Sequence, residues 1–387
     1  MFQQFRKSLA ALAVTAILAA PAFADIKAYN AAVKAGDYKT AATEAEAIWQ
    51  TWDKQSADTA LIAREFGFAA LVSGRNELAQ TFGSFLVQNG KTLPTPDDQP
   101  ATSAVLKAAA DFKVSKQGEP ERAALRDALF ARNTAPGVDM TSVISWQALY
   151  VADWNRFDWD SVKKDTAGAA DLLKRQPASL LARQREAEVM AVAADFIQGR
   201  ARQTPQTRSA IYEAMADMHD AIVADLNAAK SPGMRSQLWA IKWKAEAWTG
   251  AVESYMSSSY SQIGSVISTA VKPRGLARPD SLPVAEDAAT AAIPVCDGKF
   301  DGPSIKYPES RALEGLVGSV IFRMETAADG KVTRTEILSA VPLDTFGDRV
   351  LDAVKDWRYK ASKSSTGNSC RLNSRNHIYH VQFVIGR

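Results

Sequence analysis

The stretch YPESRALEGLVGSVIFRMETAADGKV, residues 307–332, decides the fold because its pattern differs from the helical pattern of the preceding chain. From Val320 to Met324, apolar side chains recur at every second position, which is the period of a β-strand. The pair Asp329-Gly330 then predicts a tight turn, because glycine tolerates the positive φ that hairpin turns need. We therefore expect this stretch to enter an antiparallel hairpin.

The residues after this turn complete a small module of strands and one helix. Residues 332–341 predict the partner strand, residues 342–360 predict an amphipathic helix, and residues 377–386 predict a third strand. The expected order is ββαβ. In such a module the helix covers one face of a small antiparallel sheet, and the last strand lies at the edge of the sheet.

The ordered set of residues in this module resembles the C-terminal domain of the TonB energy-transducer family. The resemblance runs from about Tyr307 to Phe383. No single position carries it; the order and the spacing of the set do. The motif residues are Tyr307, Pro308, Gly315, Gly318, Gly330 and Trp357.

The resemblance implies a binding function. Domains of this family act in the periplasm, where they bind a short segment of an outer-membrane transporter and transmit force from an inner-membrane proton motor. The binding resembles strand addition, in which a sheet edge pairs its backbone with an extended peptide. By this analogy the candidate partner-binding edge holds His377, Tyr379 and Val381. The alternative is an edge that the chain itself covers.

The chain before this module is rich in alanine and other helix formers, with apolar residues at a 3.6-residue period. Several segments, such as 28–49 and 66–87, have the pattern of two helices around a short turn, and they loosely resemble tetratricopeptide-type repeats. We expect an α+β protein with an all-α helical-repeat domain at 25–271, a proline-containing linker at 272–292 and a TonB-like domain at 293–387.

The first 24 residues have the pattern of a secretory signal peptide. The basic residues Arg6 and Lys7 precede an apolar run from Leu9 to Ala20, and an Ala-x-Ala triplet ends at Ala24. The run is shorter than the about 20 residues that span a bilayer. We therefore expect cleavage after Ala24 and a periplasmic mature chain without a membrane span. The alternative is an uncleaved leader that anchors the chain in the inner membrane.

The chain has two cysteines, Cys296 and Cys370. In an oxidising compartment, a disulfide between them is the simplest arrangement. Two free thiols or a metal site are the alternatives. Neither cysteine has another Cys or a His at ligand spacing, which disfavours a metal.

The sequence carries no recognisable catalytic motif. It lacks G-x-S-x-G, P-loop, H-E-x-x-H and C-x-x-C patterns, and its one S-x-x-K, from Ser161 to Lys164, stands without the partner motifs of that class. His377 and His380 fall on opposite faces of the expected third strand, which disfavours a shared metal. A net charge of +3 gives no indication of nucleic acid binding. We therefore expect no enzyme, no cofactor and no bound metal.

These observations favour an exported adaptor that binds protein partners of the envelope, among them a TonB-dependent outer-membrane receptor. A transducer of the family usually has an uncleaved membrane helix and a long proline-rich spacer, whereas this sequence predicts a cleavable leader and a helical domain. The resemblance thus favours binding over energy transduction. A membrane-anchored transducer and a purely structural envelope scaffold are the two alternatives.

Overall fold

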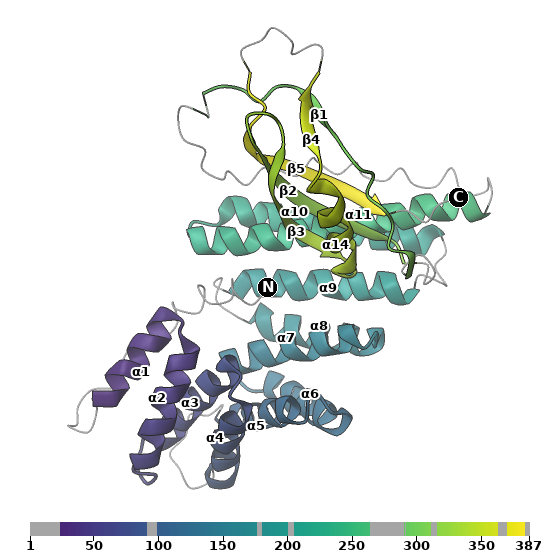
Figure 1. Cartoon of the computed structure of the whole chain (residues 1–387). Coiled ribbons are helices and arrows are strands. Elements are labelled where there is room, and N and C mark those ends of the chain that lie inside the picture. Colours follow the sequence, from purple (N-terminus) through teal and green to yellow (C-terminus); the bar gives the residue numbers. More distant parts are fainter. Residues whose placement is uncertain are drawn as a thin grey trace. The chain divides into compact units, whose positions relative to one another are not determined.

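A computed structural model describes residues 24–90, 99–175, 180–199, 205–263, 290, 292–310, 316–362 and 370–383. Nearly all of the expected leader, most of the expected linker at 272–292 and the motif residue Gly315 fall outside the described residues. The described chain is helical as far as α11 and then forms a small sheet region that includes one further helix, so the α+β class is confirmed (Figure 1). In the described part, no helix is both long and apolar enough to cross a membrane.

The helices of the long helical region are α1 (Ala24–Ala35), α2 (Tyr38–Thr51), α3 (Thr59–Ser73), α4 (Asn76–Asn89), α5 (Gln99–Val114), α6 (Glu119–Asn133), α7 (Met140–Asn155), α8 (Trp159–Lys174), α9 (Leu181–Gly199), α10 (Pro205–Ala228) and α11 (Pro232–Ile263). The sheet region consists of β1 (Gly298–Asp301), β2 (Gly318–Thr326), β3 (Val332–Val341), α14 (Thr345–Val354), β4 (Arg358–Ala361) and β5 (Ser374–Phe383).

The chain packs as two compact units, Met1–Ala194 and Asp195–Arg387, and helix α9 contributes to both. The second unit therefore contains α10 and α11 together with the C-terminal sheet. The sequence places the domain boundary at 272–292 instead. That boundary stays a prediction, because most of those residues lie outside the described part of the chain.

Successive helices of the first unit pack as antiparallel hairpins, because short turns with local capping reverse the chain. Asp37 precedes α2, and its side chain accepts a hydrogen bond from the Thr40 N–H at 3.2 Å. Gly74 ends α3 at φ +82°, a conformation that costs glycine little. Both turns fall inside the hairpins predicted at 28–49 and 66–87. A tetratricopeptide-type repeat remains a prediction for these hairpins.

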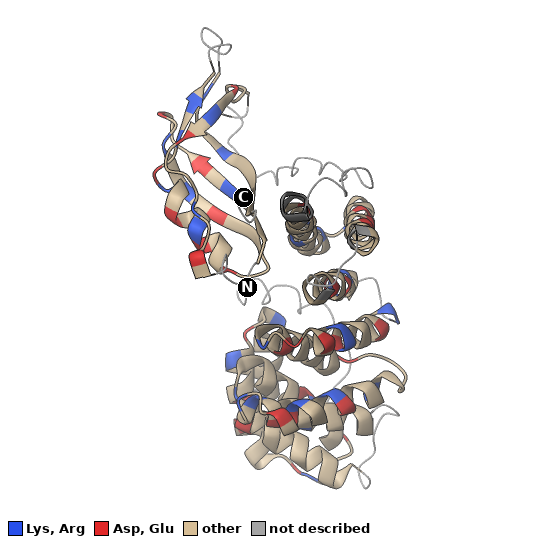
Figure 2. Cartoon of the chain, turned by 90° about the vertical axis from the view of Figure 1, so that its right-hand side faces the viewer, with Lys and Arg blue, Asp and Glu red and all other residues tan. Residues whose placement is uncertain are grey.

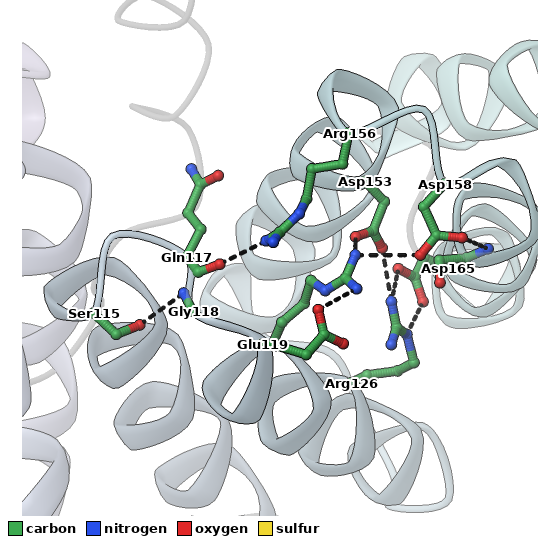
Figure 3. A network of polar contacts seen from close by, with 11 residues as sticks. Ser115, Gln117, Gly118, Glu119, Arg126, Asp153, Arg156, Asp158 and Asp165 are labelled. Carbon is green, nitrogen blue, oxygen red and sulfur yellow. Dashed lines mark hydrogen bonds and ion pairs between the residues drawn. The ribbon is translucent and has the colours of Figure 1, made fainter.

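A buried network of charged side chains joins α6, α7 and α8 (Figure 3). The Arg126 guanidinium donates to Asp165 and to Asp153, both at 2.7 Å, and Arg122 pairs with Asp153 as well. The two aspartate side chains are fully buried. Burial raises the pKa of Asp165 to about 7; the Asp153 carboxyl adds to this rise, and Arg126 opposes it. Buried charges must be paired, so the network fixes how the three helices meet.

Charged residues of both signs are interspersed along the helices and the strands, as Figure 2 shows. The net charge of +3 is therefore the small difference between 46 basic and 43 acidic residues. Ion pairs form locally in this pattern. Lys107 pairs with Asp111 on α5 at 2.5 Å, and Lys360 of β4 pairs with Asp301 of β1 at the same distance.

The C-terminal sheet has the order β3-β2-β5, with both pairs antiparallel, and β1 pairs with β4 in a separate two-stranded ribbon. Helix α14 packs on one face of the larger sheet. The apolar side chains that alternate along β2 point to this helix and build the core. The core cluster consists of Leu316, Val320, Phe322, Met324, Val332, Phe346, Val350, Val354 and Phe383.

One predicted boundary was wrong. The sequence predicts a helix over 342–360, but α14 ends at Val354, and Arg358–Ala361 forms strand β4. The buried Tyr359 explains the change, because its N–H donates to the Gly330 carbonyl at 2.7 Å in an extended conformation. The helical spacing of apolar residues thus continues in the sequence beyond the point where the backbone leaves the helix.

Candidate functional site

Strand β5 occupies one edge of the three-stranded sheet. In the described part of the chain, it pairs with β2 and with no other strand. The register places Tyr379 opposite Phe322 and Val381 opposite Val320. The last predicted strand therefore lies at an edge, the position from which strand addition starts. Strand β3 forms the opposite edge.

The three residues predicted to form the partner-binding edge lie together on the face of β5 that looks toward α14. His377 is 9% exposed, and its ring lies 4.5 Å from that of Tyr359 between centroids. The Tyr379 ring lies 5.2 Å from that of Phe300, and Val381 packs against the core cluster. Their side chains thus build the core, so a partner at this edge would meet mainly the backbone of β5.

Three of the described family-motif residues lie where the chain enters β2. The Tyr307 hydroxyl donates to the Leu316 carbonyl, and Pro308, next in the chain, is buried. Gly318 begins β2 directly against the Phe346 ring of α14, where a Cβ would lie 2.7 Å from ring carbons. Glycine at this position therefore lets the helix approach the sheet.

The other two described motif residues hold the ribbon that β1 and β4 form. Gly330 has φ +80° in the turn between β2 and β3, and it lies against the backbone of Tyr359. The indole N–H of Trp357 donates to the Pro303 carbonyl at 2.7 Å. The described motif residues therefore act through structure, by shaping the sheet that positions β5.

A disulfide joins Cys296, before β1, to Cys370, just before β5. Backbone hydrogen bonds accompany it, because the Cys296 N–H donates to the Arg371 carbonyl at 2.9 Å. The Tyr359 hydroxyl donates to the Cys296 carbonyl at 2.7 Å. The bridge therefore fixes the chain that enters β5 to the chain that enters β1.

The face of the sheet opposite α14 is also covered, which our sequence reasoning missed. Ser319 and Ile321 of β2 point to this face and are fully buried, because α11 packs against it. Gly250 of α11 lies directly over the His380 ring. A signal for this cover exists in the sequence. Val320, Ile321 and Phe322 are consecutive apolar residues, and residues 318–322 are buried without alternation, as in strands that have both faces packed.

Ser319 and His380 form a pair under this cover that has the spacing of a nucleophile and its base. The Ser319 Oγ lies 2.6 Å from the His380 Nε2. Ser319 is fully buried beneath Gly250, which leaves no space for a substrate at its hydroxyl. We therefore assign the pair a packing role. In the described residues, no group of three or more His, Cys, Asp or Glu is arranged to hold a metal ion.

Comparisons with known proteins concern the same segment. Residues 303–381 match the family described as Gram-negative bacterial TonB protein C-terminal. A relative named Protein TonB, from Klebsiella aerogenes, is 33% identical over 69 residues, which cover 18% of this chain and 28% of the relative. No solved structure matches the chain. These two matches identify the segment at 303–381 as a TonB C-terminal domain.

Proposed function

We propose that this chain is an exported interaction protein of the cell envelope that acts in TonB-dependent outer-membrane transport. In this proposal, it binds an extended segment of a partner protein by strand addition at the outer edge of β5. The observation that carries the proposal is the edge position of β5 in a TonB C-terminal domain. The proposed partner is an outer-membrane receptor of the TonB-dependent class.

The packing around β5 supports this mode of binding. Tyr379 and Val381 are held in the core, so the strand is ordered before a partner arrives. A preformed edge lowers the entropy cost of binding, and the added strand gains backbone hydrogen bonds along its length. Both faces of the sheet carry helices, α14 on one and α11 on the other. A partner strand would therefore add at the edge and not across a face.

In the proposed adaptor role, the leader and the helical region also have functions. The leader would deliver the chain to the periplasm, and the helical hairpins would bind a second envelope protein. An uncleaved leader would instead make the chain an anchored energy transducer. Amino-terminal sequencing of the protein purified from cells separates the two: a chain that begins at Asp25 excludes the anchor, and a chain that begins at Met1 supports it.

Site-specific photocrosslinking in intact cells tests strand addition. A crosslinking amino acid replaces Arg375, an exposed residue of β5, and a matched variant carries it at Thr333, an exposed residue of β3. We expect an adduct from position 375 whose peptide, identified by mass spectrometry, belongs to the periplasmic segment of an outer-membrane receptor. Equal adducts from both positions, or an adduct from position 333 alone, would contradict the proposed edge.

A structural scaffold is the second candidate, and the cover that α11 provides favours it. A sheet that packs on its own helices can stabilise a larger framework without binding a foreign strand. This candidate predicts no receptor adduct from either position, together with a loss of envelope integrity when the chain is deleted. The same crosslinking experiment therefore separates the two candidates.

A further inference from the structure

The contact between α11 and the C-terminal sheet has a polar centre. At this centre Gly250 lies so close to the sheet that a Cβ would collide with the His380 ring and would lie 2.9 Å from the Ser319 Oγ. Any larger residue at Gly250 would have to push the helix and the sheet apart or displace the imidazole. The close approach therefore depends on this glycine.

Two hydrogen-bonded pairs surround the glycine. The Ser319 Oγ and the His380 Nε2 are 2.6 Å apart within the sheet. The Gln382 side-chain amide donates to the Glu253 carboxylate of α11 at 2.9 Å, across the contact. The face toward α14, by contrast, is an apolar core. A contact centred on polar groups gains less from apolar burial and depends more on the protonation states of those groups.

We propose that the contact between α11 and the sheet is a latch that opens on acidification, with His380 as the group that takes up the proton. The latch releases the TonB C-terminal domain from α11 while both parts stay folded. This inference rests on the geometry of the contact, and it holds or fails independently of strand addition at β5.

The charged groups around His380 favour a neutral imidazole. Burial lowers the pKa of His380, and only Glu246 of α11 acts in the opposite direction. Glu246 is already paired, since Lys242 donates to it at 2.5 Å and a ring nitrogen of His219 on α10 lies 3.1 Å away. The carboxylate that could stabilise a charged His380 is therefore already paired with the Lys242 ammonium.

Two further ionisable groups face this contact. Arg323 of β2 is paired with Glu336 of β3 on the same face, farther along the sheet. Glu253 also takes up a proton as the pH falls, but its pKa is shifted in the opposite direction from that of His380. Burial raises the pKa of Glu253, and the hydrogen bonds from Gln382 and Tyr212 oppose that rise. Glu253 is therefore a second group whose protonation could alter the contact, and the test has to separate it from His380.

The direction of the pH effect follows from linkage. A histidine released to water titrates near pH 6.5, whereas the His380 held under α11 resists protonation. The open form therefore binds more protons than the closed form as the pH falls below about 6.5. The ratio of the closed to the open population then falls by up to about tenfold for each pH unit. The latch is fully closed above neutral pH and is lost on acidification.

A distance measurement on the full chain tests the latch. Nitroxide labels are placed at Ala240 of α11 and Thr333 of β3, which are both exposed, and the native disulfide stays intact. Double electron–electron resonance then reports the distance between the labels at pH 7.5 and pH 5. We expect a single narrow distribution at pH 7.5 and a broad one with longer distances at pH 5.

Matched variants assign the effect to its source. His380→Gln, which cannot take up the proton, should give the narrow distribution at both pH values, and Glu253→Gln should broaden at pH 5 like the wild type. Gly250→Leu should be broad at both values. Gly233→Leu, on the same helix at a position where a Cβ would meet nothing within 4 Å, should behave like the wild type. Circular dichroism confirms that each variant is folded.

Three results would overturn the proposal. A narrow wild-type distribution at pH 5 means that the contact does not open. A His380→Gln variant that broadens at pH 5 means that another group takes up the proton. A Gly250→Leu variant that stays narrow means that the latch is not centred on this glycine.

Discussion

Replacing Asp165 with asparagine should remove a strong pH dependence from the stability of the helical region. Burial next to Asp153 raises the pKa of Asp165 to about 7, from an ordinary value of 3.8. In the unfolded chain the carboxyl is ionised above about pH 4, whereas in the folded protein it keeps its proton up to about pH 7. The folded state thus binds more protons in this window, and the free energy of unfolding falls as the pH rises.

The size of this effect follows from the shift of about three pH units. Each unit changes the free energy of unfolding by about 1.4 kcal/mol, so the whole shift corresponds to about 4 kcal/mol. Of this contribution to stability, about 2–3 kcal/mol is lost between pH 5 and pH 8. Asparagine has the shape of the protonated acid and can donate to Asp153, but it does not titrate. We expect Asp165→Asn to be within about 1 kcal/mol of the wild type at pH 5 and more stable than it at pH 8.

Urea unfolding followed by circular dichroism at both pH values measures the difference between variant and wild type. Other titrating groups are common to both proteins, so their contributions cancel in this difference. Asp171→Asn is the matched control, because Asp171 lies on the same helix and is 69% exposed. The control should change stability by less than about 0.5 kcal/mol at either pH. A difference for Asp165→Asn that is constant from pH 5 to pH 8 would refute the assignment.

Three further changes test the C-terminal domain and the leader. Replacing Cys296 and Cys370 with alanine removes a cross-link between residues 74 apart, which should lower the free energy of unfolding of this domain by about 4 kcal/mol in denaturant titrations; an unchanged midpoint would contradict this. Gly330→Ala places a side chain at φ +80° against the Tyr359 backbone and should cost at least ~2 kcal/mol, whereas Gly74→Ala, at a similar φ in open space, should cost only about 1 kcal/mol. Mass spectrometry of the protein from an exporting host should show a chain that begins at Asp25, and retention of residues 1–24 would exclude the expected cleavage.

The local features of the C-terminal domain could be predicted because each depends on a short stretch of sequence. The alternation from Val320 to Met324 predicted β2, and Asp329-Gly330 predicted the turn into β3, as the structure has them. The end of α14 could not be predicted in this way. Trp357 fits a helical spacing with Val350 and Val354, but the backbone pairing of residues 357–359 with residues near Gly330 and with β1 decides their conformation.

Longer-range features were beyond a reading of local patterns. Gly250 and His380 meet across a separation of more than a hundred residues, and no periodicity connects them. The same holds for the side chains of the predicted edge. The sequence indicated that His377 and Val381 share one face of a strand, but only the packing shows that this face is the core. The ion network of Arg126 and Asp165 likewise depends on how α6 and α8 meet.

The covalent link before β5 has a mechanical consequence if a partner strand pulls on this edge. Tension that travels toward the amino end of β5 reaches the sulfur bridge at Cys370 within a few residues. The bridge transmits the force to Cys296, just before β1, so the ribbon of β1 and β4 and the larger sheet have to unfold together. Hydrogen bonds alone would break one after another as a strand is pulled from its end. The covalent bridge would stop this sequential rupture, so the domain would resist a larger force.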